Sequence, residues 1–206
     1  MHDIAIIDYG VGNLRSIEKA FVATGASVVV SSDERVLRVA RGLVLPGVGA
    51  FGACMNALIE RGFDQLVYER AMKGTPLLGV CVGMQMLFEQ SDEFGKHCGL
   101  DLLRGRVRRL SDELVVPHVG WNQFQQEKPH FLLANIQDQA FFYFVHSYYC
   151  EPSDYSVVIG TTKYGREFVS AVADGNLFGV QFHPEKSQKA GLQLLNNFAR
   201  VVQSNV

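Results

Sequence analysis

The sequence carries little net charge. Its 19 Lys and Arg residues nearly balance 21 Asp and Glu residues, which leaves a formal charge of −2 at pH 7 and a pI near 6.3. This balance does not favour nucleic acid or a membrane surface as a partner. The one basic cluster, Arg104 to Arg109, alternates like a solvated strand or hairpin, and a phosphate- or nucleic-acid-binding patch is the less favoured alternative.

Cysteine is scarce as well. The four cysteines fall in no CxxC or other metal-binding spacing, so we expect no metal site. The chain opens with an apolar strand pattern instead of a secretory signal, which predicts a reducing cytoplasm. The aromatic run over residues 140–150 is too short to cross a bilayer and contains His146, so it predicts a buried strand.

Repeats, low-complexity tracts and linkers are also missing, and the length suits one α/β domain over residues 1–206. The first half alternates apolar strand runs with helical spacing in the order β-α-β-β-α-β. The strands fall near residues 4–8, 27–31, 43–45 and 75–80. This alternation predicts an α/β fold with a largely parallel, doubly wound sheet, helices on both faces, and ligands at the carboxyl ends of the strands.

The second half has a different pattern. From about Leu102 onward, strand and turn patterns predict that antiparallel strands extend the sheet. A closing helix follows, and its apolar side chains share one face; they are Leu194, Leu195, Phe198, Val201 and Val202.

The strongest functional signal is a cysteine between glycines in the segment 79–83, GVCVG. An apolar run entered through Pro76 precedes it, and residues 84–90 are good helix formers, so the segment predicts a strand-turn-helix nucleophile elbow. The following helix's unpaired amides would favour the thiolate of Cys81. A buried structural cysteine in a glycine-rich turn is the alternative.

A candidate base lies about a hundred residues later, in the segment 179–187, GVQFHPEKS. A strand-like run, 177–182, ends at His183, and Pro184 breaks the strand pairing. Glu185 is close enough to accept a hydrogen bond from one ring nitrogen and so to orient the other toward the thiol. Cys81, His183 and Glu185 form a candidate catalytic triad, although a capping histidine at a strand end is the alternative.

These two segments resemble the class I glutamine amidotransferases. The segments 8–16, 46–51, 117–122 and 143–148 narrow the resemblance to the glutaminase subunits of imidazole glycerol phosphate synthases, over nearly the whole chain. Val82 stands where the motif usually has leucine, which leaves the chemistry unchanged. The resemblance implies that L-glutamine is hydrolysed through a cysteine thioester and that the ammonia passes to a (β/α)8-barrel cyclase subunit in a heterodimer, without a cofactor.

The resemblance also assigns residues around the triad. The elbow itself predicts the amide of Val82 as one oxyanion donor, and the resemblance adds the amide of Val48, in a loop that could instead be an ordinary Pro-Gly turn. Contacts to glutamine are implied for Gly49, Gln85, Ser147 and Tyr148. From spacing alone, Gln85 could equally be an exposed helix residue.

The implied docking face contains Asn13, Trp121, Tyr143 and Lys186. The lone tryptophan suits an interface anchor, although a core position is the commoner fate of such a residue. Other functions remain open at this point: a glutaminase subunit that serves a different synthase, a stand-alone γ-glutamyl hydrolase, or a sensor-like module with one reactive cysteine.

Overall fold

The computed structural model describes residues 3–111 and 113–204. Within this part of the chain, thirteen strands form one continuous sheet. Their bounds are β1 Ile4–Ile7, β2 Val28–Ser31, β3 Gly42–Gly47, β4 Leu77–Cys81, β5 Phe88–Ser91, β6 His97–Cys98, β7 Leu103–Arg109, β8 His118–Gln126, β9 Ala140–His146, β10 Tyr148–Pro152, β11 Val158–Tyr164, β12 Arg166–Asp174 and β13 Leu177–Val180.

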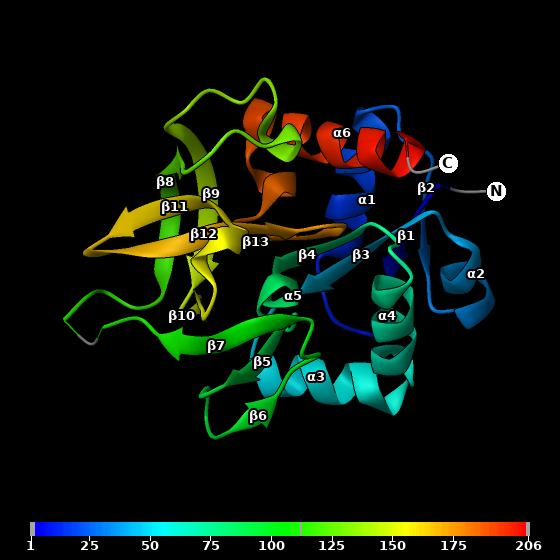
Figure 1. Cartoon of the computed structure of the whole chain (residues 1–206), viewed down its shortest axis with the longest axis horizontal. Coiled ribbons are helices and arrows are strands. Elements are labelled where there is room, and N and C mark those ends of the chain that lie inside the picture. Colours follow the sequence, from blue (N-terminus) through cyan, green and yellow to red (C-terminus); the bar gives the residue numbers. More distant parts are fainter. Residues whose placement is uncertain (1–2, 112, 205–206) are drawn as a thin grey trace.

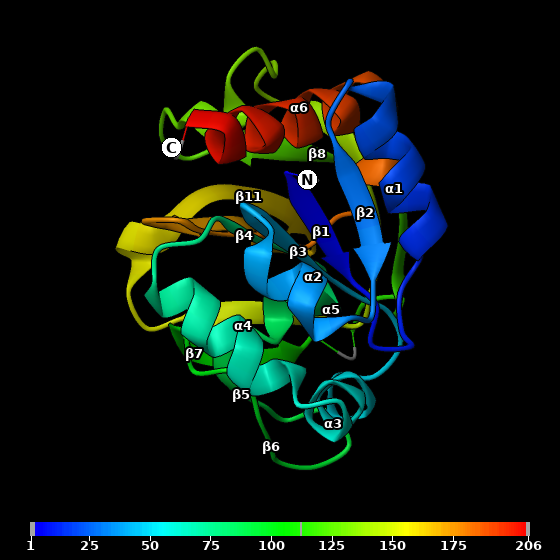
Figure 2. The ribbon, with the colours of Figure 1, turned by 90° about the vertical axis from the view of Figure 1, so that its right-hand side faces the viewer.

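Helices cover both faces of the first half of this sheet. Helices α1 and α6 lie together on one face, and α2, α3, α4 and α5 lie on the other (Figures 1 and 2). Their bounds are α1 Leu14–Ala23, α2 Glu34–Val39, α3 Phe51–Glu60, α4 Phe63–Met72, α5 Val82–Gln85 and α6 Gln188–Ser204, with short 3-10 turns η1 Phe131–Leu133, η2 Tyr155–Val157 and η3 Pro184–Lys186.

The predicted parallel sheet is confirmed. Strands β2, β1, β3, β4 and β13 are neighbours in this order and run parallel. The residues of β1, β3 and β4 are all buried, as expected for strands covered on both faces. Parallel strands end at the same edge, so the residues after β3, β4 and β13 come together although they are far apart in the sequence.

The predicted antiparallel extension is also confirmed. Strand β13 pairs antiparallel with β12, and β10, β11, β8 and β9 continue the antiparallel pairing. Strand β7 carries the basic cluster as a solvated strand, because the side chains of Arg104, Arg106 and Arg108 are exposed and form ion pairs with Glu89 and Glu151.

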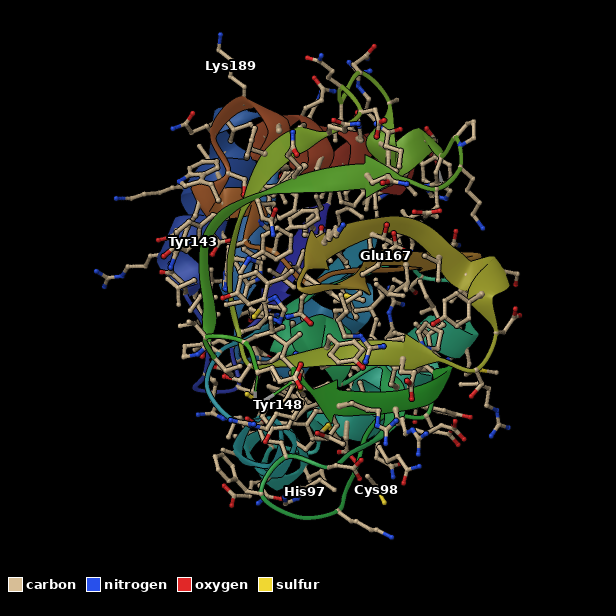
Figure 3. All side chains as sticks on the ribbon, turned by 90° about the vertical axis from the view of Figure 1, so that its left-hand side faces the viewer. His97, Cys98, Tyr143, Tyr148, Glu167 and Lys189 are labelled. Atoms are coloured by element: carbon tan, nitrogen blue, oxygen red, sulfur yellow. The ribbon has the colours of Figure 1, made fainter. Side chains whose placement is uncertain are left out.

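The aromatic run over residues 140–150 differs from the prediction of one buried strand. It forms two strands, β9 and β10, which are separated at Ser147. Alternate side chains of β9 are exposed, because β9 and β8 form a ribbon with one face toward solvent. Figure 3 shows Tyr143 of this ribbon at the surface.

The helix predicted from residues 84–90 is wrong in its extent. Helix α5 lasts one turn, and Phe88 begins strand β5, which pairs with β7. Tertiary pairing overrides the local helix propensity here, since Phe88 is fully buried against the sheet. Helices α2 and α4 were missed because their short segments carry weak apolar periodicity.

The closing helix agrees with the prediction. In α6, Leu194, Leu195, Phe198 and Val202 are buried and Val201 is partly buried. Phe198 packs against Phe21 of α1 and Phe178 of β13, which joins the helix to the sheet. Among the described residues, no helix has both the length and the apolar character to cross a membrane.

Candidate active site

Cys81 lies at the junction of β4 and α5, as the elbow predicted. Its backbone has φ 56° and ψ −114°, a conformation that is strained for a residue with a side chain. The flanking glycines permit the tight turn: a Cβ on Gly83 would overlap the carbonyl oxygen of Leu45, and one on Gly79 would lie 2.6 Å from the carbonyl oxygen of Gly83. The turn therefore holds Cys81 at the edge of the sheet with little freedom to move.

Strand register brings the other predicted segments to this edge. Gly47 at the end of β3 pairs with Cys81, so the loop that contains Val48 and Gly49 begins beside the sulfur. Val180 at the end of β13 pairs with Val80, so His183 follows on the opposite side. The sheet topology thus assembles three segments that span more than a hundred residues of sequence.

The His183 ring is held by Glu185. Its Nδ1 lies 2.9 Å from Oε1 of Glu185, and the side chains are 3% and 0% exposed. The backbone is fixed as well: the N–H of His183 donates to the Tyr143 carbonyl at 2.9 Å, and the Ser187 hydroxyl donates to the His183 carbonyl at 2.6 Å. Strand β9 and the η3 turn therefore determine where the imidazole points.

Two opposing effects act on the His183 ring. Burial alone would lower the pKa of His183, but the Cys81 sulfur and the Glu185 carboxylate outweigh it and raise the pKa to about 10. The other ring nitrogen, Nε2, is buried and has no hydrogen-bond partner among the residues that the structure describes. It remains free to exchange a proton with the thiol.

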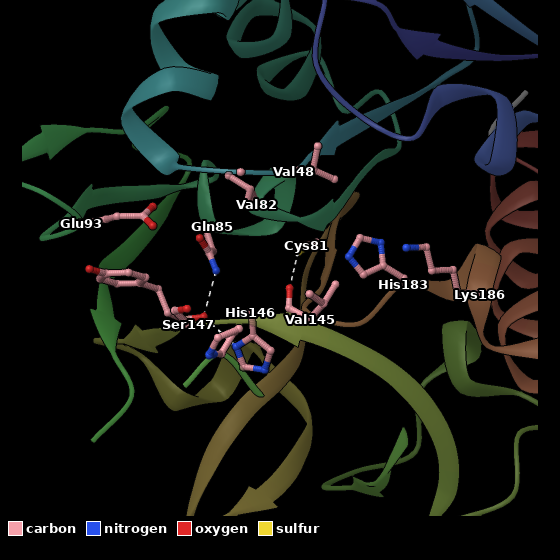
Figure 4. A pocket seen from close by; sticks show the side chains of 13 residues that line it. Val48, Cys81, Val82, Gln85, Glu93, Val145, His146, Ser147, His183 and Lys186 are labelled. Carbon is pink, nitrogen blue, oxygen red and sulfur yellow. Dashed lines mark hydrogen bonds between the residues drawn. The ribbon is translucent and has the colours of Figure 1, made fainter. Parts of the chain in front are cut away.

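A cavity opens at this edge and is lined by Cys81 and His183, by the candidate oxyanion residues Val48 and Val82, and by all the predicted substrate contacts, which are Gly49, Gln85, Ser147 and Tyr148. Glu185 stands behind His183 and does not line it. In Figure 4, Cys81, Val145, His183 and Lys186 lie on one side of the cavity, and Gln85, Glu93 and Ser147 lie on the other. We call the side with Cys81 and His183 the reacting half of the cavity and the side with Gln85 and Glu93 the recognition half.

Sequence reasoning missed Glu93, which lines the recognition half. Its carboxylate accepts the backbone N–H of Phe51, the first residue of α3, at 2.6 Å. Burial raises the pKa of Glu93, and this hydrogen bond opposes the rise. No motif marks Glu93, since its approach to the cavity depends on the pairing of β5 with β7.

Sequence reasoning also missed a buried hydrogen-bond network behind the cavity. The Gln85 amide Nε2 lies 3.0 Å from the Tyr148 carbonyl oxygen and 3.0 Å from Oε1 of Gln181. His146 Nδ1 lies 2.9 Å from the same Tyr148 oxygen, and His146 Nε2 lies 3.0 Å from Nδ1 of His118. Gln85 is therefore a buried network residue and not an exposed helix residue.

The loop after β3 is held by two side chains that the sequence did not single out. The Tyr9 hydroxyl donates to the Pro46 carbonyl at 2.6 Å, and the Cys54 thiol donates to the Val48 carbonyl at 3.2 Å. Tyr9 and Cys54 are both buried. These bonds fix the backbone on either side of the Val48 amide.

Three of the four candidate interface residues form one surface cluster. Trp121 and Tyr143 pair across β8 and β9 with ring centroids 6.1 Å apart, and Lys186 Nζ lies 5.5 Å from the Tyr143 ring centroid. Trp121 is 45% exposed, so it is not a core residue. Asn13 is the residue before α1, and α1 packs against the η3 turn that contains Lys186.

Comparison with known proteins gives the family. The family model described as glutamine amidotransferase class-I matches residues 5–202. The chain belongs to the class I glutamine amidotransferases. It is 50% identical over 202 residues to the imidazole glycerol phosphate synthase subunit HisH of Moorella thermoacetica, covering 98% of this chain and 96% of the relative. The HisH subunit of Aquifex aeolicus is also 50% identical, with 95% of each chain covered.

Solved structures agree with the amidotransferase fold. A crystal structure of a glutamine amidotransferase superposes with a TM-score of 0.78 at 18% identity, over 98% of this chain and 99% of the other. The structure of PurLQS from Thermotoga maritima superposes with a TM-score of 0.74 at 18% identity, over 98% and 99% of the two chains. At these identities the likeness shows the fold alone.

Proposed function

We propose that this amidotransferase hydrolyses L-glutamine to glutamate and ammonia through a thioester on Cys81. We further propose that it delivers the ammonia to a (β/α)8-barrel cyclase that makes imidazole glycerol phosphate in histidine biosynthesis. The proposal rests mainly on the His183 ring: Glu185 holds it at 2.9 Å, its Nε2 has no hydrogen-bond partner among the described residues, and His183 and Cys81 border the same cavity. The HisH relatives support the same reaction.

In the first step Cys81 attacks the carbonyl carbon of the glutamine side chain as a thiolate, whose proton is already held on the His183 ring because the pKa of His183 is raised to about 10. The amide oxygen becomes an oxyanion, which needs fixed donors and no competing water. The backbone amides of Val48 and Val82 are our candidates, because both residues line the cavity beside Cys81.

In the second step the imidazolium gives its proton to the leaving amine, so ammonia departs and the carbon–nitrogen bond breaks. The acyl group remains on sulfur as a thioester. The same imidazole then takes a proton from water, hydroxide attacks the thioester, and glutamate leaves as the sulfur regains its proton. One water is consumed for each glutamine.

Selectivity for free glutamine requires partners for its α-amino and α-carboxylate groups. The cavity offers Gly49, Gln85 and the backbone of Ser147 and Tyr148. We add Glu93 as the partner of the α-ammonium group, because it is the carboxylate that faces the recognition half of the cavity.

The cyclase would dock on the face formed by the β8–β9 ribbon and the η3 turn. Apolar side chains are exposed along the ribbon, which is unusual for a solvated surface; they include Val119, Trp121, Phe141 and Val145. Val145 and Lys186 also border the cavity, so a partner seated there would cover its mouth. Ammonia released under that cover stays out of bulk water. This function fits a cytoplasmic protein.

The experiment uses the pair reconstituted from this chain and the cyclase. For Cys81→Ala, glutamine-dependent synthesis should vanish, while synthesis from added ammonium salt should persist. The matched control is Cys98→Ala, because Cys98 is exposed on the β5–β6 hairpin (Figure 3) and should be neutral. Loss of both activities in Cys81→Ala would mean a structural role for Cys81.

The same assay separates the alternatives. A stand-alone γ-glutamyl hydrolase would hydrolyse glutamine at the same rate with and without the cyclase. A glutaminase of another synthase would ignore this cyclase and respond to its own partner. We expect a low rate for the isolated chain and a higher one in the complex, since docking can set the Val48 peptide in its donating orientation.

A further inference from the structure

Gln181 is a buried residue between β13 and His183, and its side chain reaches the nucleophile. It is 0% exposed, and its Nε2 lies 3.7 Å from Sγ of Cys81, within the range of a hydrogen bond to sulfur. Its backbone N–H donates to the Ser170 carbonyl at 2.9 Å, which anchors the residue to β12. The side chain is therefore fixed close to the reacting atom.

The neighbouring contacts decide which end of the Gln181 amide faces the sulfur. The Tyr148 carbonyl can only accept, so the group of Gln85 that faces it at 3.0 Å must be the amide NH₂. The same NH₂ group lies 3.0 Å from Gln181, which must accept with Oε1. The Gln181 NH₂ group is then left to face Cys81.

The Tyr148 carbonyl is itself held by His146, which is in turn held by His118. His146 must donate to it from Nδ1, so Nε2 of the neutral ring accepts from Nδ1 of His118. Nε2 of His118 in turn lies 3.3 Å from the Asn122 amide nitrogen. Burial lowers the pKa of His118 to about 4 and that of His146 to about 3, so both rings remain neutral in this chain of bonds.

From this geometry we propose that Gln181 is a catalytic residue: its side-chain N–H donates to Sγ of Cys81 and stabilises the thiolate. Gln85 is the positioning residue that keeps the Gln181 amide in the donating orientation. This inference rests on the proposed thiolate mechanism. A neutral donor suits the task, because it stabilises the negative sulfur without competing with His183 for the thiol proton, and in a buried site the bond is not weakened by water.

The test is the pH dependence of Cys81 alkylation by iodoacetamide, followed by mass spectrometry of the peptide that contains Cys81. Gln181→Glu removes the donor and adds negative charge, so the midpoint of the alkylation rate against pH should move up by about one pH unit. At a pH below the midpoint, Cys81 should then be alkylated about tenfold more slowly. Gln181→Leu removes only the donor and should shift the midpoint in the same direction by less.

The matched control is Asn197→Asp, which makes the same amide-to-carboxylate change at a buried site. Asn197 donates to the carbonyls of Leu132 and Ala134, away from the sulfur. The Asn197→Asp variant should be less stable than the wild-type chain, and its alkylation profile should be unchanged. None of the variants substitutes another titratable residue near Cys81; these residues are Tyr9, Cys54, Glu93, His146, Cys150, His183, Glu185 and Lys186.

If the wild-type chain and the folded Gln181→Glu variant show the same pH dependence of Cys81 alkylation, the inference is wrong. If that variant fails to fold, the wild-type chain still decides: the ¹⁵N-labelled side-chain amide of Gln181 should shift when Cys81 is alkylated, and an unmoved resonance would refute the role. A wild-type complex without glutaminase activity would instead refute the proposed function, while the alkylation profiles could still be compared.

Discussion

At the scale of single residues, the chemistry depends on one buried imidazole between a sulfur and a carboxylate. Burial opposes a charge on His183, yet the two neighbours raise its pKa to about 10. The ring therefore holds its proton below that pH and loses it above. An imidazolium that persists at neutral pH is the acid that a leaving amine requires.

Glu185→Gln keeps the shape of the Glu185 side chain and removes its charge. The pKa of His183 should then fall, so the alkaline limb of kcat/KM should move to lower pH by about one unit or more. The measurement is the pH profile of glutamine hydrolysis in the complex, with Glu167→Gln, at an exposed position of β12, as the control. An unchanged alkaline limb would mean that Glu185 only supports the fold.

Glu93→Gln tests substrate recognition. The amide can still accept the Phe51 N–H but cannot pair with an ammonium group, so KM for glutamine should rise about tenfold, which corresponds to about 1.4 kcal/mol. The control is Asp92→Asn, because Asp92 is adjacent and exposed. A kcat loss with unchanged KM would contradict this role.

At the scale of secondary-structure elements, the elbow depends on backbones that approach more closely than side chains allow. Gly83 packs its Cα against the carbonyl of Leu45, so α5 lies directly on β3. This contact holds the first turn of α5, and with it the Val82 amide, next to the loop after β3.

Gly83→Ala should force α5 away from β3. We expect a loss of about 3 kcal/mol in the free energy of unfolding, together with a large loss of glutaminase activity. Urea unfolding measures the first effect. Gly25→Ala is the control, because Gly25 has open space around it, and the strain of its positive φ alone should cost only about 1 kcal/mol. Equal losses for both variants would refute the close-contact explanation.

Local sequence was sufficient for the elements whose signals are short in range. The glycines around Cys81 permit a tight turn, and the proline after His183 ends the strand pairing. The elbow and the histidine turn were therefore predicted correctly. The helix predicted after the elbow was too long, because Phe88 is buried in the sheet as part of β5 and the helix ends before it.

Contacts that depend on tertiary pairing were beyond sequence reasoning. His118 and His146 meet because β8 and β9 pair in one register, and Gln181 meets Gln85 because β13 pairs with β4. Neither spacing nor composition indicates these contacts. The same holds for Glu93, whose carboxylate reaches the cavity only through the fold.

At the scale of the whole molecule, the cavity and the apolar face of the β8–β9 ribbon belong to one surface. Tyr143 contacts both Trp121 and Lys186, and Lys186 borders the cavity. A glutaminase that exports ammonia requires its mouth to be covered by the acceptor. The arrangement of this face therefore fits the proposed heterodimer.

Trp121→Ala should weaken docking of the cyclase. A central aromatic anchor contributes about 2 kcal/mol or more, so the Kd should rise at least about thirtyfold, while the free energy of unfolding of the free chain should change by only about 0.5 kcal/mol. Calorimetric titration measures the Kd. Phe131→Ala is the control, since Phe131 is similarly exposed but lies on η1, where it packs beside Phe178 and η1 contacts α6. If the Trp121→Ala and Phe131→Ala variants bind the cyclase with the same Kd, Trp121 does not lie in the interface.

The proposed chemistry requires Cys81 to be the nucleophile that attacks the side-chain amide of glutamine. The most direct measurement is peptide mapping by mass spectrometry after reaction of the complex with a diazoketone analogue of glutamine. We expect a single adduct, on Cys81, that excess glutamine suppresses. An adduct on Cys54, Cys98 or Cys150 instead, or no adduct in a complex that hydrolyses glutamine, would show that Cys81 is not the nucleophile.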